Sequence, residues 1–168
     1  MNFIVSFTAL LLALPTFAAV PQKKAAPVVP KILSGTGATY GGLAGSGFTL
    51  MDLRRTADKN IERLVFDIGD KEGAAMRGWP GYYHAELKDN PQRLVIDFAQ
   101  MPGSRLDQAA LNNRLKGSIA VKNTVMSLEP VDNTLNLTMD LKKNTKVRVY
   151  QVMGKNTTSK VVVDLITE

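Results

Sequence analysis

The stretch Arg93–Phe98 (RLVIDF) places an apolar residue at every second position, and the positions between them hold Arg93, Val95 and Asp97. A period of two is typical of a β-strand with one buried face. The turn signal Asn90-Pro91 stands just before it. Arg93 and Asp97 share the outer face but are separated by about 13 Å along the strand, so they cannot pair with each other. Each needs a partner on another strand, in solvent or in a ligand.

Near copies of this stretch recur along the chain. Arg63–Ile68 (RLVFDI) is a close copy, Lys160–Leu165 (KVVVDL) begins with Lys, and Asn136–Leu141 (NLTMDL) is weaker. In each copy the alternate apolar residues predict an inner face that contributes to one core. A strand buried on both faces would be apolar throughout, so the alternation predicts two sheets packed face to face with both outer faces in water.

Short alternating runs between turn residues continue to the end of the chain. They predict strands at 48–56, 61–68, 81–88, 92–99, 118–128, 134–142, 145–153 and 159–166. A short helix is expected near 106–115, between the two halves. The predicted fold is all-β, a sandwich of two roughly symmetric four-stranded sheets.

The first 47 residues are expected to lie outside this domain. Residues 1–18 are predicted to be a secretory signal peptide, because residues 3–17 carry no charge and Thr16-Phe17-Ala18 has small residues where a signal peptidase reads them. No Lys or Arg precedes the apolar run, yet a membrane anchor is disfavoured because a spanning helix needs about 20 residues. Residues 19–47, rich in Pro and then Gly, are predicted to be a disordered linker to a domain at 48–168.

Composition limits the kinds of site and partner, while the export signal indicates the compartment. The 168-residue chain has a formal net charge of +6 and no Cys, which excludes disulfides, thiolate metal sites and a lipid-modified Cys. A basic exported protein in the periplasm or cell envelope favours anionic partners such as cell-wall peptides, teichoic acids or lipid head groups. Nucleic acid is not expected, because the cations are scattered among acids with no interleaved aromatic stripe. No stable membrane span is expected after signal cleavage.

Catalytic motifs are sparse. His84 is the sole His, and a solvated surface His is the simpler interpretation. Asp67 and Asp97 would be candidates for a glycosidase carboxylate pair if they lay close together across strands. Arg63 and Arg93 would keep both carboxylates ionised, however, which suits binding better than acid catalysis. No metal-ligand spacing is present, so we expect no metal, no cofactor and no enzymatic activity.

Two further segments have a structural and a functional interpretation. Trp79–Tyr83 (WPGYY) gathers the sole Trp and two of the four Tyr residues, and it either packs on the core or stacks on sugars. Gly41–Gly47 lacks the Lys and the strand–helix context of a phosphate loop, so a flexible linker is favoured.

The charged outer faces also have two interpretations. Antiparallel neighbours can set the Arg of one strand opposite the Asp of the next, giving exposed ion pairs worth about 0 to 1 kcal/mol each. Alternatively, Arg presents paired donors to carboxylates while Asp accepts from hydroxyl or amide groups. The stem-peptide carboxylates and glycan hydroxyls of a cell wall supply both kinds of group.

Three segments, Arg63–Asp67, Asn90–Asp97 and Lys160–Leu165, resemble the AMIN domain, which precedes catalytic domains in bacterial N-acetylmuramoyl-L-alanine amidases and occurs in pilus secretins. The resemblance covers roughly 48–168. It implies a symmetric sandwich of two four-stranded sheets and attachment to peptidoglycan, often at the division site. The matching positions, implied to bind the ligand, are Arg63, Asp67, Arg93 and Asp97, with Lys160 and Asp164 as a weaker counterpart. Asn136 stands where a basic residue would complete a fourth copy.

The leading functional prediction is therefore a non-catalytic peptidoglycan-binding module that targets the envelope. No amidase or secretin domain follows the last strand of this sequence, so any activity is expected to belong to a partner. The alternative is an adaptor that docks onto an amidase, secretin, pilus or cell-division complex, and an edge strand with exposed apolar side chains would favour it. A small wall hydrolase is a third, weaker hypothesis.

Overall fold

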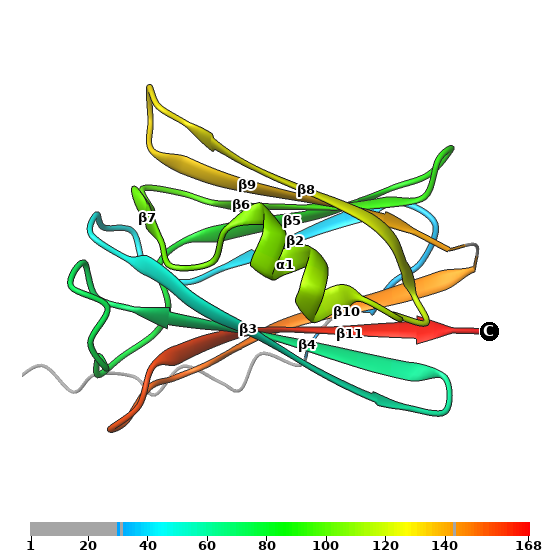
Figure 1. The fold of residues 1–168 in the computed structure, drawn as a ribbon, viewed down its shortest axis with the longest axis horizontal. Helices are drawn as coiled ribbons and strands as arrows, with labels where there is room; N and C mark the ends of the chain where they lie inside the picture. Colours follow the sequence, from blue (N-terminus) through cyan, green and yellow to red (C-terminus); the bar gives the residue numbers. More distant parts are fainter. Residues whose placement is uncertain (1–29, 31, 143) are drawn as a thin grey trace, which may run out of the picture.

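A computed structural model of the chain describes residues 30, 32–142 and 144–168. In these residues the chain forms two β-sheets in two layers and one short helix (Figure 1). The predicted signal peptide, residues 1–18, lies outside the described residues, as do residues 19–29 of the predicted linker. No helix in the described part of the chain has the length and apolar character needed to cross a membrane.

The two sheets contain six and five strands. The order in the first sheet is β1 (Ile32–Leu33), β10 (Thr145–Val152), β11 (Ser159–Thr167), β4 (Ile61–Gly69), β3 (Thr49–Asp58) and β7 (Gly103–Ser104). The order in the second is β2 (Gly37–Gly41), β5 (Tyr83–Lys88), β6 (Arg93–Phe98), β9 (Thr134–Leu141) and β8 (Val121–Glu129). Neighbouring strands are antiparallel, except that β3 and β7 are parallel.

All eight predicted strands and the helix are confirmed, with ends that coincide or shift by at most three residues. The predicted count of four strands in each sheet is wrong, because the short strands β1, β2 and β7 extend the edges. A central quartet is present in each sheet, β10-β11-β4-β3 in one and β8-β9-β6-β5 in the other. The four segments with the repeated motif, β4, β11, β6 and β9, are the middle strands of these quartets.

The inner faces of both sheets meet in one core. The side chains that the alternation assigned to the core of β4 and β6 are fully buried, namely Leu64, Phe66, Ile68, Leu94, Ile96 and Phe98. The rings of Phe66 and Phe98, one from each sheet, have centroids 5.7 Å apart and are tilted by 58°. This tilted contact is a favourable aromatic geometry. The predicted inner faces are therefore confirmed.

Part of the predicted linker belongs to the sheets. Residues 32–41 form β1 and β2, and β2 pairs with β5 from Gly37 opposite Leu87 to Gly41 opposite Tyr83. Glycine permits close packing here, because a Cβ at position 42 would lie 2.2 Å from the carbonyl oxygen of Gly81. Composition predicted a coil because it does not distinguish a glycine needed for close approach from one that adds freedom.

Helix α1 (Gln108–Leu115) lies between the two layers and packs against β8 and β3 (Figure 1). The side chain of Gln108, the first residue of α1, also contacts the edge of β8. The Gln108 amide donates from Nε2 to the carbonyl oxygen of Thr124 at 3.0 Å, and its Oε1 accepts from the backbone N–H of Met126 at 2.8 Å. These are backbone groups that an added strand would use, so part of this edge is occupied.

Candidate functional site

The repeated motif is divided between two outer faces that point away from each other. The six-strand outer face carries Arg63 and Asp67 from β4 and Lys160 and Asp164 from β11. The five-strand outer face carries Arg93 and Asp97 from β6. Asp67 and Asp97 thus lie on different sheets rather than on neighbouring strands, and the carboxylate pair considered for glycoside hydrolysis does not form.

The register gives the two faces equivalent positions. Arg63 lies opposite Asp164, as Arg93 lies opposite Asp140. Four residues further along each strand, Asp67 lies opposite Lys160, and the equivalent Asp97 lies opposite Asn136. The Arg and Asp of each motif copy therefore have partners on a neighbouring strand, as the spacing required.

On the six-strand outer face, the carboxylate of Asp164 lies between two guanidinium groups. Arg63 of β4 donates from Nε to Oδ1 at 2.6 Å and from Nη2 to Oδ2 at 3.1 Å. Arg148 of β10 donates from Nε to Oδ2 at 3.0 Å and also from Nη2. The side chain of Asp164 is 0% exposed. Oδ2 accepts three of these four hydrogen bonds and Oδ1 accepts one, and because the carboxylate has no exposed surface a ligand cannot reach it.

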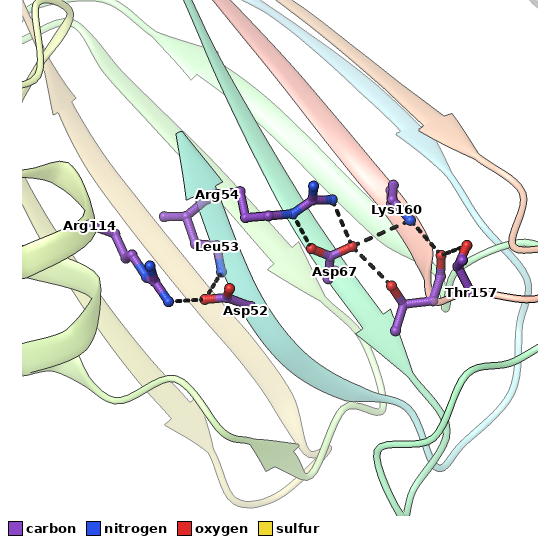
Figure 2. Close-up of polar contacts among 8 residues, drawn as sticks. Asp52, Leu53, Arg54, Asp67, Arg114, Thr157 and Lys160 are labelled. Atoms are coloured by element: carbon purple, nitrogen blue, oxygen red, sulfur yellow. Dashed lines mark hydrogen bonds and ion pairs between the residues drawn. The ribbon is translucent and has the colours of Figure 1, made fainter. Parts of the chain in front are cut away.

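Asp67 on the same face is enclosed in a similar way, as Figure 2 shows. Arg54 of β3 donates from Nε to Oδ2 at 2.7 Å and from Nη2 to Oδ1 at 3.1 Å. The hydroxyl of Thr158 donates to Oδ1 at 2.9 Å, and Nζ of Lys160 lies 3.4 Å from the same oxygen. With a side chain only 12% exposed, Asp67 also has little capacity for a ligand.

The electrostatics of these two carboxylates follow from their neighbours. Burial alone raises the pKa of Asp67 and of Asp164, but the hydrogen bonds and positive charges around them outweigh burial and hold each pKa below the usual aspartate range. The same hydrogen bonds raise the pKa of Arg54 and Arg63. Each carboxylate is therefore ionised at neutral pH and neutralised within the protein.

The expectation that all six motif side chains face water is thus wrong for Asp67 and Asp164. Both carboxylates are covered by cationic side chains that extend from adjacent strands. The guanidinium of Arg63 remains partly exposed, and Lys160 is less so. On this face the motif forms cross-strand ion pairs, the structural interpretation of the pattern.

The five-strand outer face has a more accessible pair at the equivalent position. Arg93 donates from Nε to Oδ1 of Asp140 at 2.8 Å, with side chains 41% and 30% exposed. In the described residues neither Nη group of Arg93 donates to a protein acceptor. The hydrogen bond from Arg93 lowers the pKa of Asp140, and the charge of Lys122 adds to this effect. Arg93 therefore keeps a fork of donors facing outward.

Asp97 occupies the centre of a row of polar side chains across this face. Nδ2 of Asn136 donates to Oδ1 of Asp97 at 2.5 Å, and Nδ1 of His84 lies 3.6 Å from Oδ2, beyond hydrogen-bond length. The side chain of Asp97 is 35% exposed, so it retains acceptor capacity.

The row continues to both edges of the sheet. In register order from β2 to β8 we define it as the polar row, made of Tyr40, His84, Asp97, Asn136 and Ser127. With strands about 4.8 Å apart, it spans about 19 Å. Tyr40 at one end is among the most exposed large side chains of the described chain. An exposed aromatic ring beside unsatisfied acceptors and donors is suited to a saccharide or peptide lying across the strands.

Several residues of these faces could not be assigned from sequence. Arg54 and Arg148 enclose the buried carboxylates, and Asp140 pairs with Arg93. The alternation places each of them on an outer face, but the strand order that brings them to their partners is not encoded in any local pattern. Tyr40 was missed because it lies in the segment predicted to be linker.

The aromatic segment Trp79–Tyr83 is split in the structure. Tyr83 at the start of β5 is buried in the core, Trp79 is half-buried and Tyr82 is partly exposed. Core packing is therefore established for Tyr83. A stacking role for Tyr82 or Trp79 stays a prediction.

Metal-binding geometry and known families give no further assignment. Across residues 30, 32–142 and 144–168, no group of three or more His, Asp or Glu side chains is arranged to hold a metal ion. No protein-family model matches the chain, and no curated protein matches it.

Proposed function

We propose that the protein is a non-catalytic module that binds peptidoglycan through its five-strand outer face and thereby attaches to the cell envelope. The observation that carries this proposal is the difference in acceptor capacity between the two faces. Asp164 is fully satisfied inside the protein, whereas Asp97 and the Nη groups of Arg93 remain available. Arg93 would bind a stem-peptide carboxylate, and Asp97 would accept from a glycan hydroxyl or a peptide amide.

Three features of the sequence support this proposal. The repeated motif resembles that of the AMIN domain, a module associated with cell-wall attachment. The formal net charge of +6 favours an anionic polymer. The apolar segment at residues 3–17 is typical of an export signal, which would place the protein in the periplasm or cell envelope.

Weak single contacts are compatible with retention on such a polymer. One exposed ion pair contributes about 0 to 1 kcal/mol, which gives little affinity by itself. A wall offers many identical sites, so rebinding raises the retained fraction without any additional contact. The expected behaviour is a bound fraction that depends on ionic strength, because exposed charges are screened by salt.

Co-sedimentation with purified bacterial sacculi tests the proposal. The chain without residues 1–18 should sediment with sacculi at low salt, and the double variant Arg93→Ala/Asp97→Ala should lose most of the bound fraction. Because both side chains are partly exposed, the double variant should change the unfolding free energy by only about 1 kcal/mol. Wild-type protein that stays in the supernatant at low salt would refute the proposal.

A charge-matched variant separates the face from general basicity. Arg77→Ala/Asp70→Ala removes one cation and one anion from the loop between β4 and β5, outside the five-strand outer face. It should sediment like the wild type. An equal loss in both double variants would show that binding does not depend on the five-strand outer face.

One observation favours the adaptor function as a second candidate. Strand β8 is an edge of the five-stranded sheet, and Val125 and Leu128 on it are exposed. The side chain of Gln108 hydrogen-bonds the backbone groups of Thr124 and Met126. The end of β8 at Leu128 is therefore the part left for strand addition. Proximity labelling in cells with wild type and Leu128→Lys tests this candidate. One stoichiometric partner that is lost in the variant would favour the adaptor over wall binding.

A further inference from the structure

A surface hollow lies at the end of α1. It is separate from Asp97 at the centre of the polar row and contains no residue of the repeated motif. It measures about 580 Å³ and lies among the end of α1, the following loop, the start of β8 and the end of β9. Cationic and amide side chains in its lining are Lys116, Lys122, Lys142, Asn112, Asn113 and Asn123. We call it the lysine hollow. Its volume is in the range of small-molecule sites.

Each of the three lysines that line the hollow has a different backbone setting. Lys116 follows α1, and its carbonyl oxygen accepts from Nη2 of Arg55 at 3.2 Å, which fixes the backbone there. Lys122 is the extra residue of a β-bulge, since the β8–β9 register steps from Val121 directly to Asn123. Bulges re-aim a side chain relative to the regular ladder.

The third lysine is held by a direct bond. Nζ of Lys142 donates to the carbonyl oxygen of Ser118 at 2.9 Å, which leaves two of its three ammonium hydrogens for other acceptors. Three lysines from three segments thus line one hollow, and the position of the Lys142 ammonium is fixed by this hydrogen bond.

A buried network holds the loop beside the hollow in place. The Ser118 hydroxyl donates to Oε2 of Glu62 at 2.6 Å, and the N–H of Ala120 donates to the same carboxylate at 3.0 Å. Glu62 is 0% exposed and also accepts from Nη1 of Arg55 at 2.8 Å. The loop is therefore preorganised, which lowers the entropy cost of binding a ligand there.

The other wall of the hollow is also fixed by hydrogen bonds. Oδ1 of Asn112 accepts from the Thr124 hydroxyl at 3.0 Å and from Nε2 of Gln108 at 2.8 Å. These contacts turn the amide oxygen of Asn112 toward the protein and leave its NH₂ group as a donor. The side chains of Asn113 and Asn123 are exposed beside it, and Nδ2 of Asn123 donates to Oδ2 of Asp140 at 3.4 Å.

The balance of charge in the lysine hollow is positive. Its lining contains no carboxylate. Two acidic side chains contact residues of the lysine hollow. Asp140 is paired with Arg93, and Glu62 is buried and paired with Arg55. The negative end of α1 is offset as well, because the carbonyl oxygens of Asn113 and Leu115 accept from backbone N–H groups of the following loop.

We propose that the lysine hollow is a second binding site, specific for a saccharide that carries an anionic group. The ammonium groups of Lys116, Lys122 and Lys142 bind the carboxylate or phosphate, and the asparagine amides bind ring hydroxyl and acetamido groups. The choice of an amino sugar as ligand rests on the proposed wall-binding function, whereas the anion specificity rests on the geometry of the hollow alone.

Amide chemical-shift mapping by NMR on the ¹⁵N-labelled chain tests this proposal with three probes. They are N-acetylmuramic acid, N-acetylglucosamine 6-phosphate and the neutral N-acetylglucosamine. We expect saturable shifts at residues 112–124 and 142 with a charged sugar and none with the neutral one. The charged probe that binds identifies the anion. Equal shifts with the neutral sugar, or no saturable shift with either charged sugar, would overturn the proposal.

Matched variants make the result specific to the hollow. Lys116→Ala/Lys122→Ala/Lys142→Ala should weaken binding by about tenfold or more, the loss of about 1.4 kcal/mol. The triple variant Lys71→Ala/Arg77→Ala/Lys155→Ala removes the same charge from exposed loop positions outside the lining and should bind like the wild type. Equal weakening in both would overturn the proposal.

Two additional measurements keep the test decisive. Lys122→Ala alone removes a bulge side chain without disturbing the bond between Lys142 and Ser118, and it should still weaken binding several-fold if the triple variant is unstable. Sacculus co-sedimentation is run on the same proteins. Sugar shifts without sacculus binding would refute only the proposed function, and sacculus binding without sugar shifts would refute only the lysine hollow.

Discussion

The two outer faces carry the same motif in different surroundings. Arg63–Asp67 on β4 and Arg93–Asp97 on β6 have the same pattern of Arg, Leu, Val, an apolar residue and Asp. Both lie in the middle of a four-strand quartet with equivalent register. Yet on the six-strand outer face Asp67 is buried among cations, and on the five-strand outer face Asp97 remains partly exposed. The motif alone therefore does not determine which copy is available for a ligand.

The difference arises from the strands beside each copy. On the six-strand outer face the neighbours of the carboxylates are basic. Arg54 donates to Asp67 and Lys160 forms an ion pair with it. Arg63 and Arg148 both donate to Asp164. On the five-strand outer face Asp97 has an amide and a histidine beside it, Asn136 and His84, whereas Asp140 accepts from Arg93 and from the amide of Asn123. Cationic neighbours neutralise and cover a carboxylate. Amide neighbours leave it charged and accessible, which is the condition for ligand binding.

The largest expected effect comes from removing the buried carboxylate. Asp164→Asn leaves the partly exposed guanidinium groups of Arg63 and Arg148 without their shared counterion and removes their charge-assisted hydrogen bonds, which should cost about 1.5 to 3 kcal/mol. Urea unfolding followed by circular dichroism should show this loss. The equivalent change on the other face, Asp140→Asn, should cost about 1 kcal/mol or less because that pair is exposed. Equal losses would contradict the distinction between the faces.

Acid should destabilise the protein through Asp67 and Asp164 of the six-strand outer face, in addition to the buried Glu62, whose pKa is also lowered. Since the pKa of Asp67 and of Asp164 is lowered in the folded state, their stabilising contribution is complete above the ordinary aspartate pKa of about 3.9 and is lost as pH falls through the folded-state values. The unfolding free energy should therefore fall below about pH 4. Urea unfolding from pH 7 to pH 2 should show a smaller fall in Asp164→Asn than in Asp140→Asn. The reverse order would contradict the assignment.

Exchanging the residues opposite the two Asp side chains should have the smallest effect. Lys160→Asn gives Asp67 the neighbour that Asp97 has, and it should cost about 1 kcal/mol because Arg54 and Thr158 still donate to the carboxylate. The reciprocal Asn136→Lys should change the unfolding free energy by less than about 1 kcal/mol, since the new pair is exposed. Thermal unfolding of both variants checks the pair. A large loss in Asn136→Lys would show that the Asn136–Asp97 bond has a structural role.

Much of the fold could be predicted from alternation because each strand of the quartets buries one face. In β4 and β6 the apolar positions that define the core are those found buried. The short strands β1, β2 and β7 could not be predicted, because β1 and β7 have only two residues each, β2 begins and ends with Gly, and all three are strands only through pairing with β10, β5 and β3. Pairing with strands distant in the sequence makes these segments strands, and the local sequence does not encode that pairing.

The candidate site was less predictable than the fold. The outer location of Arg93 and Asp97 followed from the period of two, but the burial of Asp164 depends on Arg148, which lies on a strand whose position in the sheet is not evident from sequence. The lysine hollow joins residues of α1, the loop after it, β8 and Lys142, which follows β9, and its bulge at Lys122 leaves no signal in the hydrophobic pattern. Contacts between distant segments produce both features.

The most direct test of the central claim is to map solubilised peptidoglycan fragments onto both faces of the ¹⁵N-labelled protein by amide chemical shifts. The account predicts saturable shifts in β5, β6 and β9 around His84, Asp97 and Asn136, with β4 and β11 unchanged around Asp67 and Asp164. Shifts confined to β4 and β11, or none on either outer face, would contradict it.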